Sequence, residues 1–106
     1  MRYRRFAGRD AWTAAMEAAL ARPASLDIVM EKGIDADAVR RVARVEVSRS
    51  SAGGISSLST DQLAEATGLP RSTVLRARLA LVELGLEDVV PHPRATLATR
   101  RELHHG

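Results

Sequence analysis

Residues 59–86 constrain the fold of this chain more than any other segment. They read STDQLAEATGLPRSTVLRARLALVELGL, which is two stretches of helix-forming residues separated by a glycine and a proline. Ser59 or Thr60 can cap the first helix, and Glu65 or Gln62 lies close to capping-box spacing. We expect this helix to end at Gly68 with positive φ. The segment therefore predicts a short capped helix followed by a tight turn.

The second helix of this segment begins at or just after Pro70, because proline suits the first helical position. Its apolar positions continue to about Leu84, where Gly85 ends it and Leu86 returns to the core. Val74 and Leu81 are expected to point inward. Two short helices joined by a tight turn are thus predicted between residues 59 and 84.

Three more helices are expected before this pair. Asp10 can cap a helix through Leu20, with Trp12 and Met16 on its apolar face. Ser25 is expected to cap a helix over residues 26–32, which Gly33 closes. A third helix runs to about residue 50, capped by Asp35 or Asp37, although its Val-Glu-Val run at 45–47 alternates like a strand.

Strands are expected on either side of the helix pair. Residues 55–58 can form a short strand after the serine- and glycine-rich loop at 50–54. Residues 87–90 and 95–99 flank a proline-rich turn and predict a two-stranded hairpin. Residues 100–106 look like a flexible tail. We accordingly divide the chain into an arm with N-terminal helices (1–34), a main domain (35–99) and the tail.

The composition of the chain excludes several classes of site and of protein. The chain has no cysteine, which excludes disulfides and thiolate zinc sites. No apolar run approaches the roughly 18 residues of a membrane span, and a secretory signal is not evident. A cytoplasmic protein without membrane association is expected. The adjacent His104 and His105 lack further ligands, so no metal is expected, and no catalytic motif or cofactor loop appears.

Positive charge gathers near the ends of the chain. Residues 2–9 hold four arginines and no acid, whereas residues 10–88 hold more acids than bases. Arg4 and Arg5, interleaved with Tyr3 and Phe6, are candidates for a phosphate- or groove-binding arm, with a disordered terminus as the alternative. The arginine bias fits phosphate and guanine recognition, and it fits a GC-rich genome equally well.

Residues 58–90 resemble winged helix-turn-helix DNA-binding proteins, including GntR-type regulators and plasmid replication initiators. The likeness rests on Leu-Ala at 63–64, Thr-Gly-Leu at 67–69, Arg-Ser-Thr-Val at 71–74, and Leu81 with Gly-Leu at 85–86. It implies a mainly α fold with a short β-wing, here carrying extra N-terminal helices. It also implies binding of double-stranded DNA, by a transcription regulator or by a plasmid or phage replication or partition factor.

The resemblance also implies which residues contact DNA. The first turns of the second, or recognition, helix enter the major groove in such motifs. The start of the preceding helix lies near a DNA phosphate, and the wing tip carries further contacts. The residues so implied are Thr60, Gln62, Arg71, Ser72, Thr73, Arg76, His92 and Arg94. A homodimer is possible, and no small-molecule effector is expected, because residues 1–34 are too few for a ligand-binding fold.

The recognition helix departs from the family pattern at Arg78, where such proteins usually carry an apolar residue. We expect Arg78 to reach water or to pair with an acid from the N-terminal region: Asp10, Glu17, Asp27 or Glu31. Leu75, Leu79 and Val82 form an apolar sector beside it. The apolar face of the first helix, or a second subunit, is expected to cover that sector. The alternative function is a protein-interaction adaptor that docks a partner there without binding DNA.

Overall fold

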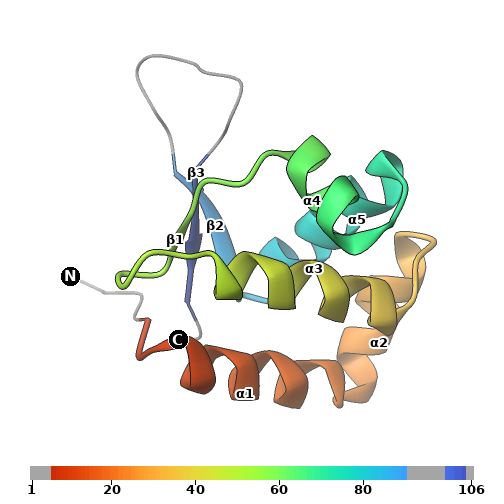
Figure 1. Cartoon of the computed structure of the whole chain (residues 1–106). Helices are drawn as coiled ribbons and strands as arrows, with labels where there is room; N and C mark the ends of the chain where they lie inside the picture. Colours follow the sequence, from red (N-terminus) through yellow and green to blue (C-terminus); the bar gives the residue numbers. More distant parts are fainter. Residues whose placement is uncertain (1–5, 91–99, 105–106) are drawn as a thin grey trace.

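The fold is mainly helical with one small antiparallel sheet (Figure 1). The computed structural model describes residues 6–90 and 100–104. Within them the elements run in the order α1 (Arg9–Leu20), α2 (Pro23–Glu31), α3 (Ala36–Ser48), β1 (Ile55–Ser56), α4 (Thr60–Thr67), α5 (Arg71–Glu83), β2 (Glu87–Val90) and β3 (Arg100–Leu103). The expected mainly α class with a short β element is confirmed.

Two N-terminal caps differ from the sequence prediction. Helix α1 begins after Gly8, which has a φ of 113° and supplies no side-chain cap, so Asp10 lies inside the first turn. Helix α2 begins at Pro23, because a proline needs no N–H partner in the first turn. Ser25, the expected cap, is therefore a buried residue of that helix. Gly33 closes α2 with a φ of 72°, as predicted.

Helix α3 forms the centre of the helical layer. The side chain of Asp35 accepts the N–H of Ala38 at 2.9 Å, which fixes Asp35 as the cap. Residues 45–47 are helical, so the strand alternative is wrong there. Helical spacing places Val39, Val42 and Val47 on one buried face. This face packs against α1 on one side and against α4 and α5 on the other.

The two-helix segment forms as predicted. Ser59 and Gln62 make a reciprocal capping box: the Ser59 hydroxyl accepts the Gln62 N–H at 3.1 Å, and Gln62 Oε1 accepts the Ser59 N–H at 2.8 Å. Gly68 adopts a φ of 75° at the C-terminal end of α4. Pro70 precedes α5, Gly85 follows it with a φ of 78°, and Leu86 is buried.

The sheet has the order β1-β3-β2, with both pairings antiparallel. Its central strand is β3, whereas the sequence interpretation placed a flexible tail from residue 100 onward. That prediction is wrong for Arg100–Leu103. Only Leu103 is apolar in this strand, so no alternating pattern revealed it, yet Leu103 is fully buried. The strand predicted at 95–99 lies outside the described residues.

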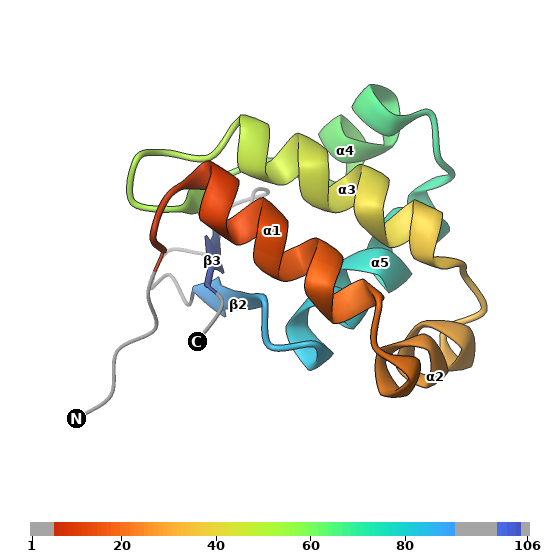
Figure 2. The ribbon, with the colours of Figure 1, turned by 90° about the horizontal axis from the view of Figure 1, so that it is seen from below.

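Helix α1 belongs to the same core as the following helices. It lies beside α3 (Figures 1 and 2). The indole Nε1 of Trp12 donates to the carbonyls of Leu86, at 3.0 Å, and His104, at 3.1 Å. These bonds turn the apolar face of α1 toward α3 and the sheet end. The prediction that this face covers Leu75, Leu79 and Val82 within one chain is therefore wrong.

Candidate nucleic-acid interface

The first two turns of α5 present a polar and exposed face. Ser72 and Arg76 are exposed, while Val74 and Ala77 on the opposite side are buried in the core. Helical geometry at about 100° per residue brings Ser72, Leu75 and Arg76 onto this outer face. The turn at Gly68 and the packing of Leu69 against the core fix the start of α5. Of the four residues of α5 that the resemblance implies as contacts, Arg71, Ser72 and Arg76 are exposed.

Arg71 is exposed, but it is not free. Its Nε donates to Asp61 Oδ1 of α4 at 2.8 Å, and both side chains are mostly exposed to solvent. An exposed pair of this kind is held weakly. A phosphate can therefore compete for the guanidinium at small cost. Until it does so, Asp61 offsets the positive charge at the start of α5.

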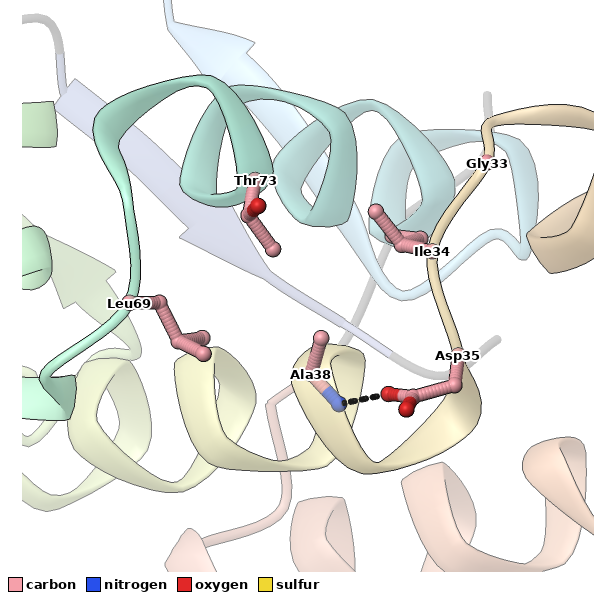
Figure 3. A pocket seen from close by; sticks show the side chains of 6 residues that line it. All are labelled: Gly33, Ile34, Asp35, Ala38, Leu69 and Thr73. Carbon is pink, nitrogen blue, oxygen red and sulfur yellow. Dashed lines mark hydrogen bonds between the residues drawn. The ribbon is translucent and has the colours of Figure 1, made fainter.

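Thr73 lies apart from the exposed face. Its side chain points from α5 toward α3 into a hollow of about 400 Å³ (Figure 3). Leu69, Ile34 and Ala38 line this hollow together with Gly33 and Asp35. The sequence placed Thr73 with Ser72 among the groove-facing residues. In the structure the two neighbouring side chains face different surroundings.

The start of α4 carries the other implied phosphate contacts. Thr60 is half-buried and Gln62 is exposed. The Gln62 side-chain oxygen is occupied by the capping box, which leaves its NH₂ group to donate to other partners. Gln62 also lines a hollow with Arg49, Glu65 and Ala66. Arg49, from the C-terminal end of α3, was missed by sequence reasoning because it is distant along the chain.

The arginines of α3 are engaged in ion pairs. The Nε atoms of Arg40 and Arg41 lie 3.0 Å from carboxylate oxygens of Glu17 and Asp37 respectively, and Arg44 Nη2 also lies 3.0 Å from Glu17. The hydrogen bond from Arg44, aided by Arg40 and opposed by partial burial, lowers the pKa of Glu17. These pairs favour a solvated, charge-balanced face over a phosphate patch.

Arg78 is the departure from the family pattern that the structure explains. Its side chain is 3% exposed, and its Nη2 donates to Glu46 Oε2 at 3.0 Å and to the Leu58 carbonyl at 2.6 Å. The predicted partners from the N-terminal region were therefore wrong. Glu46 of α3 is fully buried against α5. The two side chains neutralise each other inside the core.

An apolar strip continues along the outer face of α5. Leu75 is 40% exposed and Leu79 is 57% exposed. Leu26 and Met30 on α2 are also exposed, whereas Val82 is half-buried. Aliphatic side chains on the face that also carries Ser72 and Arg76 are compatible with contacts to thymine methyl groups or to a protein partner.

The remaining predicted contacts cannot be placed. Arg4, Arg5, His92 and Arg94 lie outside the described residues. Arg9, at the end of the basic arm, donates to the carbonyls of Val47 and Ser50 and so closes the C-terminal end of α3. Among the described residues, no group of acidic or histidine side chains is arranged to hold a metal ion, and no helix is long and apolar enough to cross a membrane.

Comparison with known proteins gives no family assignment: no family model matches the sequence, and neither a curated protein nor a solved structure shows significant similarity.

Proposed function

We propose that this protein is a winged helix-turn-helix protein that binds double-stranded DNA. The observation that carries the proposal is the exposed outer face of α5, which follows the Gly68 turn and presents Ser72 and Arg76 in its first two turns. The sheet order β1-β3-β2, with β2 following α5 directly, supports the winged arrangement. The process served is transcription regulation or plasmid or phage replication or partition, as the resemblance implies.

In this proposal α5 occupies the major groove and the residues divide into two roles. Arg76 and Ser72 contact base edges, because a guanidinium suits the two acceptors of guanine and a hydroxyl suits several bases. Arg71, released from Asp61, and the Gln62 amide contact phosphates at the groove edge. Arg49 adds a further cation beside Gln62. Thr73 faces α3, so we assign it no base contact.

Salt dependence of binding tests the proposal. With about five phosphate contacts, from Arg71, Arg49 and the arginines predicted as contacts at Arg4, Arg5 and Arg94, the logarithm of the association constant falls with the logarithm of salt at a slope near −4 to −5. The assay is fluorescence anisotropy with fragments of DNA from the source genome and a mixed competitor. Folded protein that shows no DNA affinity at ~50 mM salt contradicts the proposal.

Two arginine variants separate base reading from general attraction. Arg76→Ala should cost about 1–3 kcal/mol on the preferred sequence and less on random DNA. Arg41→Ala is the matched control, because Arg41 is an exposed arginine that belongs to α3 and is paired with Asp37. Equal losses for both variants would remove Arg76 from the reading face.

A second candidate function is an adaptor that binds a protein through the outer face of α5. The exposure of Leu79, at 57%, favours it, since large apolar side chains on a surface often mark a contact site. Leu79→Ser distinguishes the two functions. For an adaptor it abolishes partner binding, and Arg76→Ala does not impair DNA affinity because there is none. For a DNA-binding protein, Arg76→Ala weakens DNA binding more than Leu79→Ser does.

A further inference from the structure

The inner face of the small sheet is joined to the helices by a buried group of charged side chains. Glu87 on β2 is fully buried, and its Oε1 accepts Arg101 Nη1 of β3 at 3.1 Å. Glu46 on α3 is also fully buried and accepts Arg78 of α5. These four side chains, which we call the buried ionic cluster, come from four different elements.

Each of the two carboxyl groups in the cluster has one buried oxygen that receives no donor from the described residues. These oxygens are Glu46 Oε1 and Glu87 Oε2. A buried acceptor without a donor is costly. Glu46 and Glu87 lie close enough to interact through their charges and through a side-chain hydrogen bond, so two ionised carboxylates here would also repel each other. One proton placed between the two groups satisfies both oxygens at once and removes the repulsion.

The electrostatics of Glu87 agree with this geometry. Burial raises the pKa of Glu87 well above its usual range. The neighbouring Glu46, through its charge and through a hydrogen bond, raises that pKa further, while Arg101 and Arg78 lower it. The two arginines thus compensate only part of the cost of ionising Glu87.

We propose that the folded protein binds one proton between Glu46 and Glu87, and that this proton fastens the β2–β3 pair to α3 and α5. In this site Glu87 carries the proton and donates a hydrogen bond to the Glu46 carboxylate, which also accepts a hydrogen bond from Arg78. The other oxygen of Glu87 accepts the hydrogen bond from Arg101. The site is independent of whether the protein binds DNA.

The proton site makes folding sensitive to pH in a defined direction. In the unfolded chain Glu87 ionises near 4.5, whereas the folded protein keeps its proton to higher pH. The stabilisation is complete below 4.5 and is lost as pH rises through the folded pKa. The charged groups facing Glu87 are Glu46 of α3, Arg78 of α5 and Arg101 of β3, and from β1 the neutral Ser56 lies opposite Arg101. Asp88 faces the other side of the sheet and pairs with His104.

The test compares the wild type with Glu87→Gln, whose amide N–H replaces the shared proton at every pH. We expect the ratio of the unfolding constants, wild type over variant, to rise by up to tenfold per pH unit above 4.5, until the folded pKa is passed. Chemical denaturation at pH 5 to 9, in steps of about one unit, measures both constants. The ratio cancels the pH dependence of all other groups.

Glu102→Gln is the matched control, because Glu102 neighbours the same strands but is on the opposite face from Arg101. The ratio for Glu87→Gln should rise with pH more steeply than the ratio for Glu102→Gln does. A flat ratio for Glu87→Gln would overturn the proton site and would indicate that Glu87 is ionised in the folded protein.

A measurement on the wild type covers the case in which Glu87→Gln does not fold. In protein labelled with ¹³C at glutamate side chains, one carboxyl carbon should titrate well above 4.5. Hydrogen exchange of the amides in β2 and β3 should accelerate over the same pH interval beyond the intrinsic base-catalysed rate. If every glutamate carboxyl titrates at or below its ordinary value, the proposal fails.

Discussion

Replacing Trp12 by phenylalanine tests how α1 is attached to the rest of the fold. The indole is fully buried, and its Nε1 is shared between the carbonyls of Leu86 and His104. Those carbonyls follow α5 and end the sheet, so one side chain joins three parts of the molecule. Phenylalanine keeps an aromatic ring at this position but removes the donor and part of the volume.

The expected loss of stability has two parts. The Leu86 carbonyl still accepts the N–H of His104 at 2.9 Å, so the lost donor costs about one buried hydrogen bond, or about 1–3 kcal/mol. The smaller ring leaves a void of roughly 40 Å³, which at ~24 cal/mol per Å³ adds about 1 kcal/mol. We therefore expect Trp12→Phe to destabilise by about 2–4 kcal/mol.

Chemical denaturation followed by far-UV circular dichroism measures this difference. Ala14→Ser on the exposed side of the same helix is the control, with an expected change within about 0.5 kcal/mol. If Trp12→Phe also changes stability by less than about 0.5 kcal/mol, Trp12 does not hold α1 to the sheet end, and the placement of α1 in the core is refuted.

Two further predictions concern a turn and an ion pair. Gly68→Val should destabilise by about 1–2 kcal/mol in thermal melts, because φ is 75°, although a Cβ there would meet no atom of the described residues within 4 Å. A melting temperature equal to that of the wild type would disprove strain as the reason for glycine. Glu17→Gln should destabilise by less than about 1 kcal/mol near neutral pH, since Glu17 is 34% exposed. Because the pKa of Glu17 is lowered, chiefly by Arg44, its stabilisation holds above the ordinary pKa and is lost as pH falls through the folded value; a difference between variant and wild type that grows in acid would contradict this.

Local signals in the sequence predicted most helix boundaries in the central part of the chain. The capping box depends on hydrogen bonds between Ser59 and Gln62, and the left-handed conformation of Gly68 depends on local backbone sterics. Both features can therefore be predicted from residues that are close in the sequence. The apolar spacing in α3 predicted its buried face for the same reason. At the start of α1 both Gly8 and Asp10 are suitable N-terminal caps, and the prediction of Asp10 was wrong.

Exposure within the candidate interface was only partly predictable. The outward position of Ser72 and Arg76 follows from helical periodicity around the buried Val74. Thr73 lies about 100° around α5 from Ser72 and faces the loop before α3 (Figure 3), which the sequence does not place there. Arg49 approaches Gln62 only once α3 and α4 are packed together.

The sequence by itself determined which segments are helical, where the turn between α4 and α5 falls, and that Ser72 and Arg76 of α5 face outward. These features depend on interactions between near neighbours. The tertiary structure alone decided the partners of distant residues. Arg78 meets Glu46 across 32 positions, and the Trp12 indole reaches the His104 carbonyl across 92. The strand Arg100–Leu103 likewise exists only because β1 and β2 supply hydrogen bonds on both of its edges. Such pairings are fixed by how the apolar faces pack against one another. In the sequence alone, several residues of the same charge or size are equally suitable partners for a given side chain.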